Sequence, residues 1–559
     1  MSLQVTLAVD QVKLVHTLKH TFSSSSSVYT ELAQNARRAD ATRIDFRTFE
    51  DGFEIEDDGS GIHDFAALLR VASSGWDEAV IEREGPYGLG FLIALHSCER
   101  IEIESCGQRL DAQTAGILNF VSQPITQCER ITGTLIRLSG GVKQSLVMEK
   151  PHFSNAPFVG AARLFKGFPI PVTLNSQDVP RPHAANDDFV KTSIGDISVA
   201  TLAGDDIEAT DMHVYLQGLS ISLPSASGVE RFPAVIHLDP VQFHGRAPDR
   251  SLVIEEDAAT RVQSALRDVV VARLMEVVKS QPDRLWNCQR ALTFTDHQHL
   301  LNAVDVIPKD FLTTADCSTL DLGRREWFGR KRNLPKNAAM ISRQDLENYS
   351  LIVPADVLGD WNGMPEEEPD TLAYVNIVAY VASVKGATLI ETDKIPEGHW
   401  IYSLPSLVRE PMVKVASYVP AEAPDHYLNT CDGSEQEIVF GSEVQLEGPL
   451  GMVPSALGYG VTPDLRIAVQ QNANTWALVH AFCDFKDEND RYEEDSAERH
   501  SNRVAIAQSA AFGGNTAKLL RAALDESYQF NALRSSLGGK SFKVSIDEKG
   551  NISVEPMAD

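Results

Sequence analysis

Three short segments near the beginning of the chain carry residues whose types and spacing can do chemistry. In the first, ELAQNARRADAT (31–42), Glu31 and Asn35 lie four residues apart and so share one face of a predicted helix. A carboxylate placed there can deprotonate a water molecule, and an amide oxygen can join the oxygen shell of Mg2+. Taken alone, the pair also fits a solvated helix face, so its meaning depends on the neighbouring segments.

The second segment, EIEDDGSGI (54–62), is a predicted strand that ends at Asp57 and enters a glycine turn. A carboxylate at such a strand end can accept a hydrogen bond from the exocyclic amine of adenine, a contact that guanine cannot make. Gly59 and Gly61 allow a tight turn and the close approach of a flat base to the backbone. An ordinary turn is the alternative, because Asp-Gly-x-Gly alone is a weak signal.

The third segment, GPYGLGF (85–91), leads into the apolar helix-start pattern FLIAL. Gly85, Gly88 and Gly90 expose backbone N–H groups before a helix N-terminus, where the helix dipole favours anions. No Gly-Lys-Ser/Thr follows, so this is not a Walker loop. The preceding IERE is not a strand pattern, which argues against a dinucleotide-binding fold.

The elements around these segments predict an α+β fold. Residues 43–57 alternate apolar and polar side chains around Asp51-Gly52, which predicts a hairpin. The segments 100–105 and 133–138 repeat the alternation. Helix, hairpin, helix and further strands are the order of a sandwich with helices on one face of a mixed sheet.

Three domains are expected along the chain. Residues 1–150 would form the nucleotide-binding domain, and residues 151–282 an α/β module that ends in a long amphipathic helix at about 257–279. Residues 283–559 would form a mixed α/β region for a partner or client, with one or two subdomains and a final hairpin.

Composition narrows the class of protein. With 559 residues, 43% apolar and 23% charged, the chain is typical of multi-domain soluble proteins. It has no apolar run long enough for a membrane helix and no signal-peptide pattern, so we expect a cytoplasmic protein that does not bind membranes. The net charge of -28 opposes nucleic-acid binding over the whole surface. Seven scattered cysteines without a CxxC pair favour reduced thiols over disulfides or zinc.

Together the segments resemble the GHKL ATPases, the superfamily of gyrase, the ninety-kilodalton heat-shock chaperones, histidine kinases and MutL proteins. ELAQNARRADAT is similar to the MutL-type helix motif, and GPYGLGF to the chaperone-type glycine motif. Gly133-Thr134, which opens a late strand, is similar to a fourth family element. The resemblance covers about residues 25–140 and implies a Bergerat-type sandwich that binds ATP and Mg2+.

The resemblance also implies roles for individual residues. Glu31 would be the general base and Asn35 the Mg2+ ligand, while Asp57 would read adenine. The residues expected beside the base are Gly59, Gly61 and Thr134. The residues expected around the phosphates are Gly85, Gly88, Leu89, Gly90 and Phe91, and residues 63–84 would form a short lid.

One departure from the family pattern concerns Arg38, which stands where many members carry an aspartate. Arg37 and Arg38 can pair with phosphates, pack as apolar stems or bind a partner. The second module resembles the family's transducer, which often sends a basic residue to the γ-phosphate. Lys166, Arg246 and Arg250 are candidates, although a structural ion pair is an equal alternative for each.

Two functions follow from this resemblance. In the first, ATP closes the lid and drives homodimerisation, hydrolysis resets the state, and the C-terminal region binds a protein or nucleic-acid partner. In the second, the chain is a non-hydrolysing ATP sensor or adaptor in a defence, repair or chaperone system. Glu31 favours the first, because binding alone needs no base. The chain has no room for a histidine kinase's phospho-acceptor helices before residue 31, and no topoisomerase nucleophile domain is evident.

The segment GRREWFGRKRNLPK (323–336) is locally basic in an acidic chain and contains Trp327 and Phe328. Basic and aromatic side chains together can hold phosphates and stack on bases. A loop that docks on an acidic neighbour is the alternative. Nucleic acid would be contacted through Arg324, Arg325, Arg330, Lys331 and Arg332.

Overall fold

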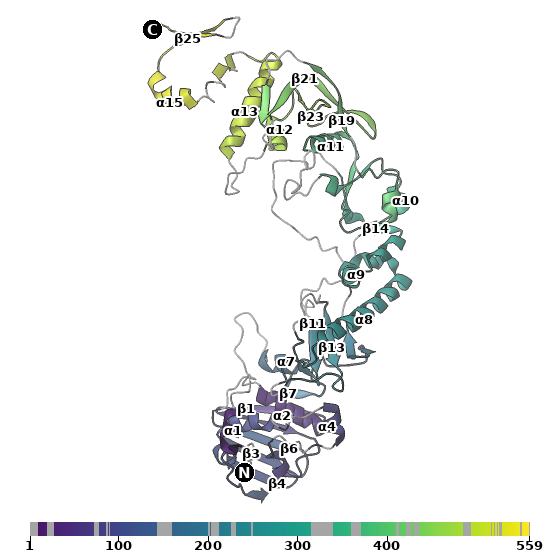
Figure 1. Cartoon of the computed structure of the whole chain (residues 1–559), viewed down its shortest axis with the longest axis vertical. Coiled ribbons are helices and arrows are strands. Elements are labelled where there is room, and N and C mark those ends of the chain that lie inside the picture. The colour runs from purple at the N-terminus through teal and green to yellow at the C-terminus, as the bar shows by residue number, and fades with distance from the viewer. Residues whose placement is uncertain are drawn as a thin grey trace, which may run out of the picture. The chain divides into compact units, whose positions relative to one another are not determined.

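An eight-stranded mixed sheet organises the first part of the chain in a computed structural model of the protein (Figure 1). The strand order is β5-β4-β3-β6-β2-β1-β7-β8, and all neighbours are antiparallel except β1 and β7. The strands are β1 (Ile44–Phe49), β2 (Gly52–Asp57), β3 (Arg100–Ser105), β4 (Gln108–Gln113), β5 (Ile125–Gln127), β6 (Thr134–Ser139), β7 (Val172–Leu174) and β8 (Gln177–Asp178). The predicted hairpin at 43–57 is therefore the pair β1 and β2.

The structure describes most of the chain, with gaps. The described residues are 9–18, 27–71, 76, 78–84, 88, 90–141, 159–199, 202, 212–224, 231–246, 250–314, 339–358, 371–409, 413–420, 426–429, 435–483, 494–515, 517–518, 520–521, 524, 528–547 and 551–557. They divide into two units, Met1–His297 and Gln298–Asp559.

Helices cover one face of the sheet, and their apolar sides form a common core with its strands. These helices are α1 (Gln11–Leu18), α2 (Ser27–Arg38), α3 (Phe65–Leu68), α5 (Gly90–Ser97), α6 (Thr114–Leu118) and α7 (Val159–Phe165). The remaining described helix of this region, α4 (Glu78–Glu84), is not part of that core cluster. Tyr29 of α2 is fully buried and packs on Phe46 and Phe53, while Phe165 of α7 stacks on Phe46. Helices on one face of a mixed sheet are the α+β sandwich that the sequence predicts, so the predicted fold class is confirmed.

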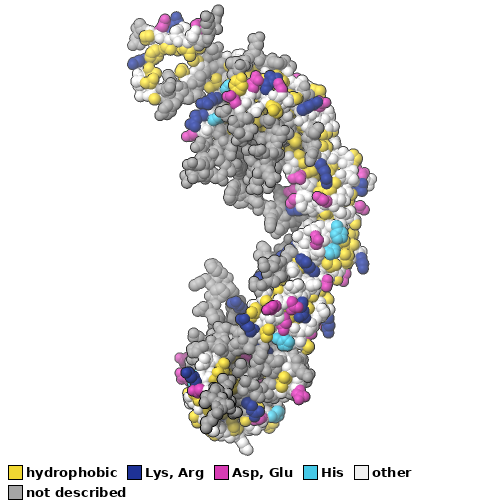
Figure 2. Space-filling model, in the orientation of Figure 1, with side chains coloured by type: hydrophobic (Ala, Val, Ile, Leu, Met, Phe, Trp, Pro, Cys, Tyr) yellow, Lys and Arg dark blue, Asp and Glu magenta, His cyan; other side chains and the backbone are white. Residues whose placement is uncertain are grey.

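The opposite face of the sheet carries charged side chains in place of helices. Glu54 on β2 is 7% exposed and accepts hydrogen bonds from Arg47 on β1 and Arg137 on β6, each at 2.6 Å. Arg109 on β4 pairs with Glu102 on β3 in the same way, at 2.9 Å. Figure 2 shows basic and acidic side chains beside one another on the visible surface of this unit. Cross-strand pairs of opposite charge let this face meet water without an apolar layer.

A second sheet lies in the same unit, with the order β12-β11-β13-β10-β9. Its strands are β9 (Val190–Thr192), β10 (Gly195–Ser198), β11 (Met212–Leu216), β12 (Leu219–Ser220) and β13 (Ala234–Leu238). The long helix expected at 257–279 is α8 (Ala258–Ser280), and η3 (Pro282–Cys288) and α9 (Gln289–Thr295) follow it. Because β7 and β8 join the first sheet, that sheet extends past residue 150. The domain boundaries at 150 and 282 stay predictions.

The described residues of the second unit form four sheets and two apolar core clusters. The longest strand, β21 (Glu435–Gly448), pairs with β19 (Lys414–Pro420), β20 (His426–Asn429), β22 (Gly451–Pro454) and β24 (Ile467–Gln470), and β24 also pairs with β23 (Tyr459–Val461). The shorter pairings join β14 (Val306–Pro308) with β16 (Met340–Ser342), and β18 (Thr388–Ile390) with β15 (Leu312–Thr314) and β17 (Ile352–Pro354). The chain closes with the predicted hairpin, β25 (Phe542–Ile546) and β26 (Ile552–Pro556).

The helices of this second unit are α10 (Arg343–Leu346), α11 (Thr371–Ser383), α12 (Thr475–Phe482), α13 (Glu494–Ala511) and α15 (Tyr528–Leu537). Its short 3-10 turns are η4 (Gln298–Ala303), η5 (Lys309–Phe311), η6 (Ala355–Leu358) and η7 (Trp400–Ser403). Among the helices that the structure describes, none combines the length and the apolar character needed to cross a bilayer.

Candidate functional site

The helix α2 presents Glu31, Asn35 and Arg38 along one side, because these residues are spaced by four and three positions. On the other side, Tyr29 and Ala33 are fully buried in the core. Glu31 and Asn35 are half-buried, whereas Arg38 is 5% exposed. The packing of the apolar side thus fixes how the polar side faces the rest of the unit.

The first turn of α5 lies against the carboxylate of Glu31. A Cβ atom at Gly90, the first residue of α5, would lie 2.9 Å from Cδ of Glu31, so only glycine fits there without displacing the carboxylate. Gly88 has a φ of +63°, a left-handed conformation that glycine adopts without strain. The structure therefore brings Glu31 and the end of the predicted glycine loop together.

Asp57 marks the opposite end of the candidate site, at the last residue of β2. It lies in register with Thr134 of β6, and its Oδ1 accepts the backbone N–H of Gly59 at 2.9 Å. Burial raises the pKa of the Asp57 carboxyl to about 6, although the N–H groups of Gly59 and Thr134 act in the other direction. At neutral pH the side chain is mostly ionised and can accept a hydrogen bond from a ligand.

Ser105 is a member of this group that the sequence did not indicate. It ends β3 in register with Thr134, and the two hydroxyl oxygens lie 3.2 Å apart. The Ser105 hydroxyl donates to the carbonyl oxygen of Gly133 and accepts the N–H of Ile62, both at 2.8 Å. Gly61 has a φ of +81°, and a Cβ there would lie 2.8 Å from Ser105 Oγ. Ser105 and Cys106 therefore pack directly on Gly61, and a side chain at this position would displace them.

Arg37 and Arg38 both bind one carboxylate, that of Glu84 at the end of α4. Arg37 Nη1 donates to Oε1 at 3.1 Å and Arg37 Nη2 also donates to Oε2, which accepts Arg38 Nε at 3.0 Å. Arg38 Nη1 further donates to Oδ1 of Asn35 at 3.1 Å. Burial acts to raise the pKa of Glu84, but the two arginines outweigh it and hold the pKa below its ordinary value. The structure shows a contact that the three expected roles did not include, a buried ion pair with Glu84 of the predicted lid.

The second sheet reaches this ion pair through Gln217, in the turn between β11 and β12. The backbone oxygen of Gln217 accepts Gln34 Nε2 at 2.8 Å, and its own Nε2 donates to the carbonyl oxygen of Glu84 at 3.3 Å. Its Oε1 accepts Arg250 Nη1 at 3.1 Å. Sequence reasoning missed both Glu84 and Gln217, since these contacts depend on how separate elements pack.

The three basic candidates of the second module lie in different surroundings. Burial and then the nearby charge of Arg250 lower the pKa of Arg38, which places Arg250 near the Arg38 end of α2. Lys166 is instead close to His183, whose pKa falls to about 4 because of burial, His213, Lys166 and His237 in that order. Arg246 has an exposed side chain. Arg250 is thus the candidate that lies by the Glu31 helix.

Some predicted residues fall outside the described part of the chain. These are Gly85 and Leu89 of the glycine loop and the basic residues Arg324, Arg325, Arg330, Lys331 and Arg332. Phe91 is described, and it packs half-buried against the core.

The donor groups fit a nucleotide with its magnesium ion. The side-chain amide oxygen of Asn35, Oδ1, has two lone pairs. One accepts the hydrogen bond from Arg38, so the other is left for a metal ion. Among the described residues, no three His, Cys, Asp or Glu side chains could together hold a metal ion. A site with one protein oxygen suits Mg2+, which keeps several waters and takes further ligands from phosphates. At the other end of the site, the Asp57 carboxylate and the backbone at Gly61 fit the nucleobase of that nucleotide.

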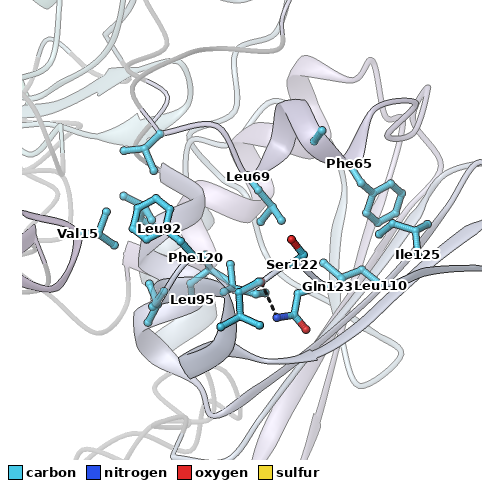
Figure 3. A pocket seen from close by; sticks show the side chains of 15 residues that line it. Val15, Phe65, Leu69, Leu92, Leu95, Leu110, Phe120, Ser122, Gln123 and Ile125 are labelled. Atoms are coloured by element: carbon cyan, nitrogen blue, oxygen red, sulfur yellow. Dashed lines mark hydrogen bonds between the residues drawn. The ribbon is translucent and has the colours of Figure 1, made fainter. Parts of the chain in front are cut away.

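An apolar cavity of about 360 Å3 lies beside this group of residues without sharing any of them. It extends below α3 toward α5, α6 and β4, and Figure 3 shows Phe65, Leu92, Leu110 and Ile125 around it. Gln123 and Ser122 are the uncharged polar residues of its lining. With no ionisable side chain in the lining, this cavity offers no acid, base or phosphate ligand.

Comparison with known protein families supports the interpretation of this group of residues as a nucleotide site. Residues 22–129 match the model of the family described as "Histidine kinase-, DNA gyrase B-, and HSP90-like ATPase". The match spans α2, β2, α5 and β3, but not Thr134 or the second sheet. No curated protein matches the chain.

The raised pKa of Asp57 predicts how Asp57→Asn changes stability with pH. The folded state binds the Asp57 proton more tightly than the unfolded state, so protonation of Asp57 stabilises the fold. This contribution to the free energy of unfolding is fully present below the ordinary pKa near 3.8 and is lost as pH rises through about 6. Asparagine stays neutral and keeps an acceptor for the Gly59 N–H. We expect Asp57→Asn to gain about 2 kcal/mol in free energy of unfolding relative to wild type between pH 4 and pH 8.

Urea unfolding at several pH values measures this gain. The exposed neighbour Asp58, whose pKa is held below its ordinary value by hydrogen bonds from Thr42 and Arg43 despite slight burial, provides the control Asp58→Asn. That control should show no gain above pH 6. An Asp57→Asn gain that does not depend on pH would contradict the assigned pKa.

Proposed function

Because the N-terminal domain belongs to the GHKL superfamily of ATP-binding domains, we propose that this chain binds magnesium-ATP and hydrolyses it to drive a conformational change. The observation that carries the proposal is the contact of Glu31 with the start of α5. It places a carboxylate, an amide oxygen and a helix N-terminus together, within the part of the chain that matches the family. Hydrolysis needs a base at the terminal phosphate, and Glu31 supplies one.

Each end of the site has its own task in this proposal. Asp57 accepts the adenine amine, with Thr134 beside it and the bare backbone of Gly59 and Gly61 against the ring. Asn35 offers one oxygen to Mg2+, which would neutralise phosphate charge and orient the terminal phosphoryl group. The loop formed by Gly85, Gly88, Leu89, Gly90 and Phe91 donates backbone N–H groups to the phosphates.

Glu31 acts on water in this scheme. Its carboxylate accepts a proton from the attacking water as the bond from the water oxygen to the terminal phosphorus forms, while the bond from that phosphorus to the bridging oxygen breaks and ADP leaves. The resulting ADP and phosphate no longer bridge α2, the lid and the second sheet. The release of these contacts returns the lid to its open state, and lid motion of this kind often limits turnover.

Arg250 is the residue that we propose for the second module's contact with the γ-phosphate. It is held by Gln217, whose backbone and side chain also contact α2 and the end of α4. A cation delivered from a second sheet senses whether the terminal phosphate is present. Hydrolysis would thereby be reported to the module that follows the nucleotide-binding domain.

The partner side of the proposal rests on the sequence. We propose that ATP drives pairing of two copies and that residues 283–559 bind a protein or nucleic-acid partner in the cytoplasm. Nucleic acid would be held through the basic segment 323–336. A non-hydrolysing sensor or adaptor is the alternative function.

ATP hydrolysis by Glu31→Gln tests the central role. We expect kcat to fall at least about 100-fold with little change in ATP affinity, since glutamine retains the shape but cannot accept a proton. Phosphate release and equilibrium nucleotide binding measure the two effects, with Glu54→Gln on the open sheet face as the matched control. Equal hydrolysis by Glu31→Gln and wild type would refute the assigned base. A wild type that binds ATP without hydrolysing it would support the sensor alternative.

Arg250→Ala tests the link to the second module. We expect kcat to fall about 10-fold or more, because the developing phosphate charge loses a cation. Lys166→Ala removes a cation from the same module away from α2 and should leave kcat unchanged. Steady-state kinetics measure kcat for both variants. An equal fall in kcat for Arg250→Ala and Lys166→Ala would contradict the assignment of Arg250 to the γ-phosphate.

The mass of the full-length protein in solution tests ATP-driven pairing. With a non-hydrolysable ATP analogue and Mg2+ we expect the dimer mass, and with ADP the monomer mass. Light scattering after size separation gives both values. A monomer under both conditions would remove dimerisation from the proposal.

A further inference from the structure

Glu84 is a buried carboxylate held by two arginines at the C-terminal end of α2. Its side chain is 1% exposed, and the side chains of Arg38 and Arg37 that bind it are 2% and 17% exposed. A carboxylate accepts two donors from a guanidinium in the same fork geometry that a phosphate accepts. Glu84 therefore presents to the two arginines the chemistry that a nucleotide phosphate would present.

Arg38 has a donor that Glu84 does not reach. Its Nε binds Glu84 and its Nη1 binds the side-chain oxygen of Asn35. The Nη2 atom of Arg38 is buried and has no hydrogen-bond partner among the described residues. An unpaired buried donor of a charged group costs free energy until an acceptor reaches it. This donor points to an anionic ligand.

The position of Glu84 in the chain connects it to the nucleotide loop. It is the last residue of α4 and directly precedes residues 85–91, the loop proposed to wrap the phosphates. Its carbonyl oxygen accepts Gln217 Nε2 of the second sheet. Arg38, which binds its carboxylate, also binds Oδ1 of the proposed metal ligand Asn35. A shift of Glu84 would thus reach the loop, the metal ligand and the second sheet together.

We propose that Glu84 is an internal anion that competes with the phosphates of ATP for Arg37 and Arg38. The inference rests on the proposed function. Without nucleotide the carboxylate holds both arginines, and Arg38 holds the Asn35 oxygen. When the phosphates arrive they take over donors from Glu84, and the second lone pair of the Asn35 side-chain oxygen stays available to the metal ion. Glu84 is accordingly a positioning residue that sets how strongly the site distinguishes ATP from ligands with fewer phosphates.

If Glu84 has a purely structural role, neutralising its charge should change ATP affinity in the opposite direction. If the carboxylate only anchors the start of the loop, its neutralisation disorders the loop and weakens ATP binding. If it competes, neutralisation leaves two arginines without their partner and strengthens ATP binding. The glutamine side chain of Glu84→Gln keeps the size and one acceptor oxygen, so the charge is the main change.

Equilibrium binding of ATP, ADP and adenosine to full-length wild type and Glu84→Gln, with Mg2+ present, tests the proposal. We expect Glu84→Gln to bind ATP about tenfold more tightly, the size of one charge-assisted hydrogen bond, with a smaller gain for ADP. Adenosine carries no phosphate, so its affinity should not change. Glu54→Gln is the matched control, because Glu54 is also nearly buried between two arginines but lies on the open face of the sheet.

The outcomes separate this inference from the proposed function. Wild type that binds ATP, with equal or weaker binding by Glu84→Gln, overturns the competition and leaves the proposed function standing. Failure of both proteins to bind ATP overturns both. If circular dichroism shows that Glu84→Gln does not fold, Glu84→Asp replaces it. The shorter carboxylate draws the charge away from the arginines, and we expect about twofold to threefold tighter ATP binding, where an anchor predicts a loss.

Discussion

The packing of aromatic side chains beneath α2 is the interaction on which the rest of the site depends. Tyr29 lies 4.4 Å from Phe53 and 6.1 Å from Phe46 between ring centroids, and Phe165 stacks on Phe46 at 5.6 Å. Each of these rings is buried, and large rings tolerate little rotation in a dense core. The rotation of α2 about its axis is therefore fixed, and with it the direction of every polar side chain on its other side.

This packing also ties distant parts of the chain to one helix. Phe165 belongs to α7, beyond the part that matches the ATPase family, and it precedes β7, which pairs in parallel with β1. The elements that follow the nucleotide-binding motifs therefore help to hold α2 in place. A movement of α2 on ligand binding would therefore disturb its packing on β1 and, through Phe46, the packing of α7.

The sequence was sufficient for the parts of the fold that local pattern determines. The pattern of apolar residues predicted the hairpin of β1 and β2 and the helix α8 to within one residue at each outer end, and the motif 31–42 predicted a helix at α2 without fixing its bounds. Motif chemistry selected Glu31, Asn35 and Asp57, whose roles stay proposals. Local pattern could not show that β7 and β8 complete the first sheet, since three-residue and two-residue strands carry almost no periodic signal.

The missed site residues have a common physical reason. Ser105 reaches the Asp57 end only through the register of β3 on β6, which no single strand specifies. Glu84 and Gln217 act through contacts 47 and 133 residues apart in the chain, with Arg37 and with each other. The same holds for Arg38, because its ion pair with Glu84 was not among the three roles expected from the sequence. Residue type and spacing predict what a side chain can do, whereas partners are set by packing.

The apolar hollow beneath α3 has a mechanical consequence. Phe65, Ala66 and Leu69, in α3 and just after it, border about 360 Å3 of space instead of close-packed side chains. Atoms that face a void have few dispersion contacts to lose when they are displaced. This stretch of the predicted lid can consequently move with less loss of packing than α2, whose Tyr29 is fully buried among other rings.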